Sequence, residues 1–427
     1  MPSILLVTAL YPPSRQIGGR RVHRFAKGLR DRGWTVTVLC PKPPYMAPLD
    51  QQGPADPGIE MLHTDALVPR VWMRNRVGAP PQTPGPGQPA AVSLRSVLKR
   101  TVGQALALTE FPDELAGWML PAMLAVVGRR FDVVLASAPP HTTLLLGAQV
   151  AQLTGAKLVL DYRDPWSELM SSDGSYGHER SFGPWLCQLH QWTEDRVLGR
   201  AQLVLGVTPQ ICRWLQPRTR APIQFLPNSL DSAPPDPPLP RDRPQRLVYA
   251  GSLAYERSLG SVLTALAVLR EPLGPDQVRL TYAGPHGDRL RHSAEALGVA
   301  DYLDDHGVLG HAASLALYRG AAAGIVSVSA RTDYSYPGKL FEVLAAGCPI
   351  LLVGPAQCEA AKLVRELGAG VVDDGLDLAS SVQTLRALLL REPGRPVGLE
   401  NWLAGVQVGK LDGLLRGLGN GVWNATL

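Results

Sequence analysis

Short runs of almost wholly apolar residues recur along the chain, separated by stretches with apolar residues at helical spacing. The first run, residues 4–8, precedes a turn-rich loop and then Val22, Phe25 and Leu29, which repeat as one face of a helix. Such runs are typical of parallel strands covered on both faces. Further runs occupy residues 35–39, 131–136, 157–161, 202–206, 247–251, 278–282, 324–328 and 350–353. Strands and helices alternate, which predicts an α/β fold with doubly wound parallel sheets.

A proline-rich stretch divides these strands into two series. With 427 residues the chain is too long for one core. We therefore expect two Rossmann-like domains at residues 1–232 and 246–401, joined by a semi-rigid linker at 233–245. Residues 402–427 should contain a final helix. Two such domains facing across a cleft would place ligands at the carboxyl ends of the strands.

Composition narrows the class of protein. A hydrophobic share of 45% and a charged share of 19% are those of a globular protein. The net charge of +5 favours acidic ligands but is no nucleic-acid signature. No apolar run reaches the ~18 residues that span a bilayer, and the chain opens directly on a strand, so we expect a cytoplasmic protein. The sequence does not indicate an oligomeric state.

The cysteines indicate neither disulfides nor zinc. Five are present, without a C-x-x-C pair or a Cys/His cluster. A disulfide framework and a structural zinc site are therefore not expected.

Residues 337–349 carry the strongest local signal. Pro337 and Gly338 open a helix, Glu342 follows one turn later, and a buried strand comes after. A helix start at the carboxyl ends of parallel strands offers free N–H groups and the positive dipole end to a diphosphate. An ionised Glu accepts from two hydroxyls, which suits a ribose diol. The alternative is an ordinary α/β unit whose helix begins with Pro-Gly.

Several segments, in this order, resemble one family. They are the opening strand–Tyr-Pro-Pro–Gly-Gly–helix block and the segments 161–166, 227–231, 249–253 and 337–349. Together they resemble the GT-B glycosyltransferases of family GT4, a glycosyltransferase group 1-like family, especially its bacterial branch in polysaccharide and glycoconjugate assembly. The likeness covers nearly the whole chain.

The resemblance implies a retaining enzyme that needs no metal and no cofactor. Its C-terminal domain would bind a nucleoside-diphosphate sugar of the UDP or GDP type, and its N-terminal domain a hydroxyl acceptor. That acceptor would be a glycan, a lipid-linked sugar or a small glycoconjugate. The final helix would cross back to the first domain. No Asp-x-Asp pair stands in a setting typical of a metal site.

The resemblance also implies site residues. Gly18 and Gly19 lack a Cβ and would admit a donor phosphate, although an ordinary tight loop is the alternative. Arg257 would clamp the diphosphate with a bidentate guanidinium, or else be an exposed helix residue. The predicted donor site comprises Gly18, Gly19, Gly251, Ser252, Arg257, Gly338, Lys339, Leu340 and Glu342.

Catalytic and acceptor residues are predicted at strand ends. His141 resembles a family loop that carries a substrate-contacting His, with a structural role as the alternative. Asp164 would orient an acceptor hydroxyl or pair with Arg163. The predicted catalytic set is His141, Asp164, Arg257 and Lys339, and the predicted acceptor set is Arg20, Arg163 and Asp164. His306, Gly307 and Gly310 stand where the family holds the base.

One position departs from the family pattern. Many GT4 members carry a Glu eight residues before the counterpart of Glu342, and this chain has Tyr334 there. The usual contact to the donor sugar is thus not assigned.

Basic residues cluster around a Pro-Gly-rich loop. Trp72 and Met73 lie among them, and the cations are Arg70, Arg74, Arg76, Arg95, Lys99 and Arg100. One interpretation is a solvated basic face. The other is a docking surface for a lipid-linked acceptor or an anionic membrane leaflet.

Two rival functions stay open at this point. A GT-B-shaped sugar-nucleotide epimerase would act without an acceptor. A catalytically silent nucleotide-sugar-binding subunit is conceivable because of Tyr334. A dehydrogenase is disfavoured, since no G-x-G-x-x-G follows either opening strand.

Overall fold

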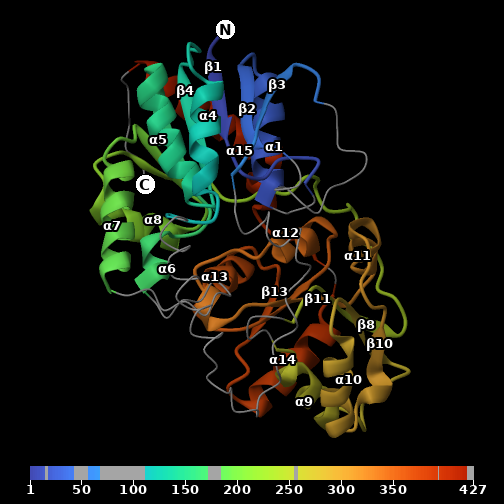
Figure 1. The fold of residues 1–427 in the computed structure, drawn as a ribbon. Coiled ribbons are helices and arrows are strands. Elements are labelled where there is room, and N and C mark those ends of the chain that lie inside the picture. Colours follow the sequence, from blue (N-terminus) through green and yellow to red (C-terminus); the bar gives the residue numbers. More distant parts are fainter. Residues whose placement is uncertain are drawn as a thin grey trace. The chain divides into compact units, whose positions relative to one another are not determined.

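The computed structural model describes residues 1–14, 18–42, 56–67, 111–171, 184–253, 258–392 and 394–420 (Figure 1). The contacts within the chain define two compact units. Unit 1 comprises the described residues of Met1–Gly206, Cys212–Gln224 and Leu411–Leu427, and unit 2 those of Val207–Ile211 and Phe225–Lys410. Each unit is built around one sheet.

Unit 1 contains a seven-stranded sheet with the order β3-β2-β1-β4-β5-β6-β7. The strand pairs from β3 to β6 are all parallel. The order reverses at β1, because β2 and β3 extend to one side of it and β4 to β7 to the other. The strands are β1 (Ser3–Val7), β2 (Thr35–Pro41), β3 (Ile59–Thr64), β4 (Val133–Ala138), β5 (Lys157–Tyr162), β6 (Leu203–Gly206) and β7 (Ile223–Phe225).

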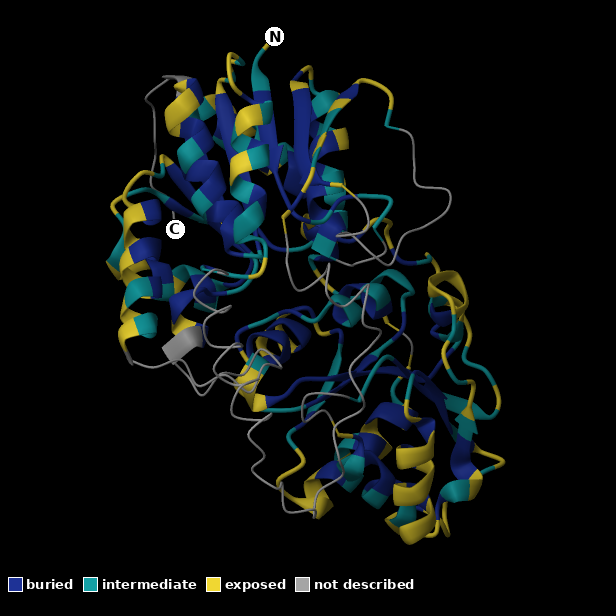
Figure 2. Cartoon of the chain, viewed as in Figure 1, coloured by how far each residue is buried: buried dark blue, intermediate teal, exposed yellow. Residues whose placement is uncertain are grey.

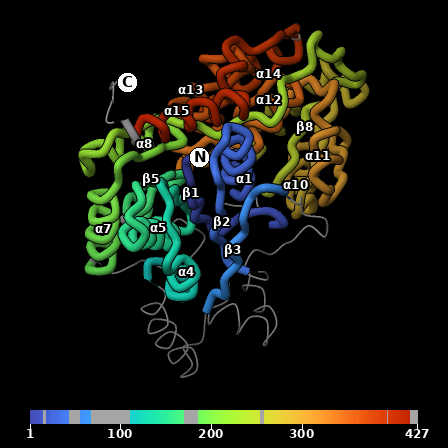
Figure 3. The backbone as a smooth tube through the Cα atoms, turned by 90° about the horizontal axis from the view of Figure 1, so that it is seen from above, coloured from blue at the N-terminus to red at the C-terminus, as the bar shows by residue number. Residues whose placement is uncertain are grey.

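Helices cover both faces of this sheet. Figure 3 shows α4 and α5 together on one face and α1 on the opposite face. Within α1 the buried residues Val22, Phe25 and Leu29 form the stripe that the sequence predicts. The α-helices of this part of the chain are α1 (Gly18–Arg30), α4 (Met119–Ala125), α5 (Thr142–Thr154), α6 (Ser167–Ser171), α7 (Pro184–Leu198) and α8 (Pro209–Leu215).

Unit 2 contains a six-stranded sheet with the order β10-β9-β8-β11-β12-β13, and every neighbouring pair is parallel. The strands are β8 (Gln245–Ala250), β9 (Val278–Ala283), β10 (Leu303–Asp305), β11 (Ala323–Ser327), β12 (Ile350–Val353) and β13 (Gly370–Asp373). The α-helices are α9 (Gly260–Val268), α10 (Gly287–Ala296), α11 (His311–Leu317), α12 (Gly338–Ala345), α13 (Glu359–Glu366) and α14 (Leu378–Leu390).

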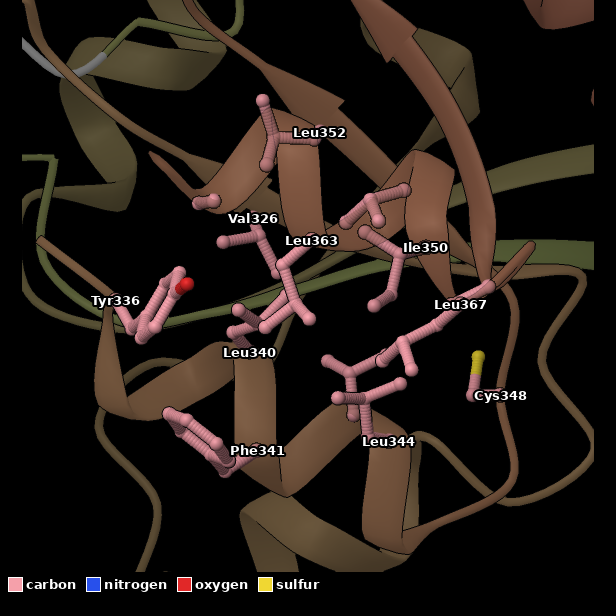
Figure 4. Packing of buried hydrophobic residues seen from close by; sticks show 14 of the residues in the cluster. Val326, Tyr336, Leu340, Phe341, Leu344, Cys348, Ile350, Leu352, Leu363 and Leu367 are labelled. Atoms are coloured by element: carbon pink, nitrogen blue, oxygen red, sulfur yellow. The ribbon is translucent and has the colours of Figure 1, made fainter. Parts of the chain in front are cut away.

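Alternation along the strands of unit 2 gives one core on each face of the sheet. Val326 and Leu352 pack with α12 and α13, and Figure 4 shows this cluster around Leu340 and Leu363. The intervening strand residues point to the opposite face, where the core includes residues of α9, α10 and α14. Figure 2 accordingly shows both sheets buried, while exposed positions lie on the helices and loops.

The sheets confirm the predicted α/β, doubly wound fold. Every strand predicted from an apolar run is present. The prediction missed β3, β7, β10 and β13, which are short or only partly buried, so that no apolar run marks them.

The proline-rich segment 233–245 lies within unit 2. Arg241 donates from Nη1 to the Leu389 carbonyl at 2.9 Å, and the Asp242 N–H donates to the Gly320 carbonyl at 2.8 Å. The longer segment of unit 2, Phe225–Lys410, contains the whole of this stretch.

The final helix, α15 (Ala404–Asn420), ends in unit 1. Its Asp412 accepts a hydrogen bond of 2.7 Å from the Trp34 indole, and Arg416 donates to the Arg32 carbonyl at 2.8 Å. The indole and the backbone at the end of α1 therefore fix the last turns of α15.

Candidate functional site

The strand order of unit 2 reverses between β8 and β11. In such sheets ligands bind at the carboxyl ends of the strands beside the reversal. Gly251 directly follows β8, and Ser327 is the last residue of β11. The candidate site is built from these strand ends and from α12.

Helix α12 separates apolar from charged positions. Pro337 is its N-cap residue, with φ −57° and ψ 140°. Leu340, Phe341 and Leu344 point into the core, as Figure 4 shows. Lys339 and Glu342 lie outside this core cluster, three residues apart and thus neighbours on the helix surface. The Lys339 Nζ donates to Oε2 of Glu342 at 2.7 Å, with the side chains 29% and 10% exposed.

Lys339 also reaches the loop after β8. A Cβ atom added to Gly251 would lie 3.8 Å from Cε of Lys339, an ordinary van der Waals contact. The Tyr249 hydroxyl donates to the Ser252 carbonyl at 2.9 Å and so fixes the same loop. The structure therefore brings together Gly251, Ser252, Lys339 and Glu342 of the predicted donor site.

The loop after β9 packs directly on this loop. A Cβ atom on Gly284 would lie only 2.1 Å from the carbonyl oxygen of Gly251. No side chain fits in that space, so a glycine is needed where the two strand-end loops touch.

Two further side chains approach Glu342. His311, the first residue of α11, lies with Nδ1 3.7 Å from Oε1 of Glu342. The Tyr318 hydroxyl accepts from the Ala250 N–H at 3.3 Å. Burial raises the pKa of Tyr318 well above its ordinary value, and the nearby charge of Glu342 adds to the rise. Neither residue belongs to the predicted site, because their proximity to Glu342 arises only in the folded unit.

Leu340 has a core position in the structure. Its side chain is fully buried, and its N–H donates to the Pro337 carbonyl at 3.0 Å. Gly338 begins α12 beside Lys339. Arg257, predicted as a diphosphate clamp, lies outside the described residues, as do the basic residues of segment 70–100.

In unit 1, Arg163 donates to backbone carbonyls at the start of α1 and at the end of β4. Its Nη1 donates to the Gly18 carbonyl at 2.6 Å, Nε to Ala138 at 3.0 Å and Nη2 to Pro139 at 2.6 Å. A Cβ atom on Gly18 would lie 2.5 Å from Nη1 of Arg163. These contacts join Arg163 to Gly18 within unit 1, and they do not test the donor and acceptor roles predicted for the two residues.

His141, the N-cap residue of α5, stacks on the ring of Trp166. Its ring lies parallel to that of Trp166 at 5.2 Å, and the Trp166 indole donates to Nδ1 of His190 at 3.0 Å. Burial lowers the pKa of His141 to about 3, with a smaller contribution from His190. His141 is therefore a neutral, 5% exposed imidazole near pH 7.

The remaining predicted residues of unit 1 lie near these two. Gly19 is buried in the first turn of α1, beside half-buried Arg20. Asp164 directly follows Arg163 and is also half-buried. The roles predicted for all site residues stay predictions.

The sequence reading missed a buried ion pair in unit 1. Arg21 donates to Asp161 from Nη2 at 2.8 Å and from Nε at 3.0 Å, with 4% and 0% of the side chains exposed. Ser137 donates to the same carboxylate at 2.7 Å. Only the placement of Asp161 at the end of an apolar strand hinted at a buried partner.

The described residues contain no group of three or more His, Cys, Asp or Glu side chains arranged to hold a metal ion. Likewise, no described helix combines the length and apolarity that crossing a membrane requires.

Residues 18–229 match the family model of the glycosyl transferase 4-like domain. Over these residues, just under half of the chain, the sequence is similar to that family. None of the curated proteins compared with the chain is similar to it in sequence.

Solved structures with the same fold span the whole chain. Sucrose-phosphate synthase from Thermosynechococcus elongatus is 14% identical and has a TM-score of 0.65, with 99% of this chain and 100% of that chain covered. α,α-Trehalose 6-phosphate synthase from Burkholderia multivorans is 11% identical and has a TM-score of 0.59, with 98% of this chain and 99% of that chain covered. The lipopolysaccharide outer core galactosyltransferase WaaB is 11% identical and has a TM-score of 0.55, with 97% of this chain and 99% of that chain covered.

The two parallel-sheet units and these neighbours establish the GT-B fold. The family and the fold together identify a glycosyl transfer enzyme.

Proposed function

We propose that unit 2 binds a nucleoside-diphosphate sugar at the carboxyl ends of β8 and β11. The observation that carries this proposal is the Lys339–Glu342 pair beside the Gly251 loop. An ammonium group and a helix start suit a diphosphate, and a carboxylate suits ribose hydroxyls. The names of the similar structures agree with a sugar or sugar-phosphate substrate class.

The proposed reaction is glycosyl transfer with retention of configuration. The acceptor hydroxyl attacks the anomeric carbon on the face from which the nucleoside diphosphate departs. The bond from that carbon to the phosphate oxygen breaks, a bond to the acceptor oxygen forms, and the hydroxyl proton passes to the leaving phosphate. Catalysis then rests on positioning and on stabilising the charge that grows on the diphosphate.

In this proposal the protein neutralises the diphosphate without a metal ion. Lys339 and the N–H groups at the start of α12 supply positive charge from the described residues. Arg257 is the further cation predicted from the sequence. A chelator should therefore leave donor binding unchanged.

The acceptor would be a hydroxyl compound bound mainly by unit 1, through Arg20, Arg163 and Asp164. We further propose that the enzyme works in the cytoplasm at the inner face of the membrane, on a lipid-linked acceptor. On α4, Leu120 and Leu124 are each 65% exposed, which supports a peripheral contact with lipid. Failure of the protein to sediment with either anionic or neutral liposomes would remove the membrane proposal.

One observation favours a second candidate, a silent nucleotide-sugar-binding subunit. Tyr334 is buried and occupies the position where many GT4 members carry a Glu. Slow hydrolysis of a donor sugar by the purified protein would exclude this candidate.

Thermal unfolding in the presence of UDP- and GDP-sugars tests the proposed function. A donor that binds only the native state must raise the melting temperature. The increase should persist with a chelator present. If no sugar nucleotide of either type raises the melting temperature, the proposal is wrong.

A further inference from the structure

A cavity of about 590 Å³ lies in unit 1 at the amino ends of β6 and β7. Its volume is within the range of pockets that bind small organic molecules. The walls come from the end of α7 with the loop into β6, and from residues 217–222, which lead into β7. None of the residues predicted for the donor or acceptor site is among those that line it.

Both charged side chains of the lining are arginines, Arg218 and Arg220. Arg218 is neutralised by two acidic residues outside the lining. Its Nη1 donates to Oε2 of Glu194 at 2.7 Å, and its Nε donates to Oδ1 of Asp195 at 2.9 Å. Arg220 is exposed, and among the described residues its guanidinium group has neither a hydrogen bond nor an ion pair. The cavity therefore offers one uncompensated positive charge to a ligand.

The other polar side chains of the lining have partners within the protein. The Thr219 hydroxyl donates to the Leu198 carbonyl at 3.2 Å. Gln202 accepts from the Leu158 N–H at 2.6 Å and donates to the Arg200 carbonyl at 3.0 Å. The remaining lining residues are glycine, alanine, leucine and proline. The wall thus combines mainly apolar contact surface with the single cation of Arg220.

We propose that this cavity is a second ligand site, which binds a small organic anion with an apolar body. The body packs against the leucine and proline side chains, and its carboxylate or phosphate group binds Arg220. A guanidinium group forms paired, charge-assisted hydrogen bonds with either anion, and burial of the apolar body adds to the affinity. The site is separate from the proposed donor site, because Lys339 and Glu342 belong to unit 2.

Isothermal titration calorimetry at constant ionic strength provides the test. The probes phenyl phosphate and benzoate combine one ring with the two kinds of anionic group. Inorganic phosphate carries the charge without the ring, and benzyl alcohol carries the ring without the charge. A preference between the first two probes identifies which anionic group the site takes.

Three variants separate the contributions of charge and volume. Arg220→Ala removes the cation, and Ala221→Leu places a larger side chain in the cavity while Arg220 stays. Arg130→Ala is the matched control, because Arg130 is also an exposed arginine of unit 1 but lies outside the lining. Substitutions at exposed positions should leave the fold intact, and melting temperatures of all three variants check this.

The wild type should bind phenyl phosphate or benzoate in about the millimolar range or tighter. That affinity should exceed its affinity for inorganic phosphate and for benzyl alcohol. Arg220→Ala should weaken binding about tenfold or more, since hydrogen bonds to a charged group are lost. Ala221→Leu should also weaken it, because the apolar body is displaced, and Arg130→Ala should bind like the wild type.

Four results would each overturn the proposal. The first is that the wild type binds neither phenyl phosphate nor benzoate, and the second is that inorganic phosphate or benzyl alcohol binds as tightly as they do. The third is unchanged affinity in Arg220→Ala or in Ala221→Leu. The fourth is an equal loss of affinity in Arg220→Ala and Arg130→Ala, which would indicate a general effect of surface charge.

Discussion

Arg21 and Asp161, which are 140 residues apart in sequence, form a buried ion pair between α1 and β5. The guanidinium group also lies 4.7 Å from the ring centre of Phe25. Both charges are desolvated, so their hydrogen bonds are what makes burial tolerable.

Replacing Asp161 by Ala should destabilise unit 1 by about 3–5 kcal/mol, because Arg21 would then be left buried without its counter-charge. Denaturant unfolding followed by circular dichroism measures the change. The double variant Arg21→Met, Asp161→Leu serves as the control and should lose less. If the double variant is as unstable as Asp161→Ala, the loss does not come from the stranded charge.

His141 should make stability depend on pH. Its pKa is lowered from 6.5 to about 3 by burial, so the unfolded chain binds the proton more readily than the folded one. The stability that comes from the neutral, buried His141 is fully present above pH 6.5. It declines as the pH falls from 6.5 towards 3. At pH 5 the loss is about 2 kcal/mol.

The variant His141→Phe keeps a ring to stack on Trp166 and removes the titrating group. The free energy of unfolding should therefore decrease more between pH 7 and pH 5 in the wild type than in this variant. Identical pH dependence of the two proteins would show that His141 is not a buried neutral imidazole.

Gly284→Ala should disturb the loops after β8 and β9. The new Cβ would lie 2.1 Å from the Gly251 carbonyl oxygen, so backbone must move, at a cost of about 1–3 kcal/mol. Nucleotide binding should weaken as well, since Gly251 belongs to the candidate site. Gly274→Ala is the control, because a Cβ there has nothing within 4 Å. Equal melting temperatures and affinities for both variants would refute the close contact.

The fold could be predicted because its strands are apolar runs. Residues 350–353 are buried in a parallel sheet, and their composition alone reveals this. By contrast, β10 (Leu303–Asp305) carries two aspartates, and β13 (Gly370–Asp373) begins with glycine. Their pairing with longer neighbours defines them as strands, and a local pattern contains no information about that pairing.

The candidate site was only partly predictable. Lys339 and Glu342 are three residues apart on one helix, so their proximity follows from helical geometry. Arg163 is predicted to bind acceptor, and the sequence did not indicate that its guanidinium nitrogens donate to the carbonyls of Gly18, Ala138 and Pro139. A cation at a strand end has the same sequence signature in either role. The partner of a long side chain is determined by the tertiary fold.

The donor site at Glu342 and Lys339 is the central claim, and calorimetric titration of UDP and GDP in the presence of EDTA tests it most directly. The wild type should bind at least one of them without a metal ion. Glu342→Ala should bind it about tenfold or more weakly, since hydrogen bonds to a charged group are lost. Lys339→Ala, and Arg257→Ala as predicted from the sequence, should also bind it more weakly. Unchanged affinity in Glu342→Ala and Lys339→Ala, or binding that requires a divalent ion, would contradict the account.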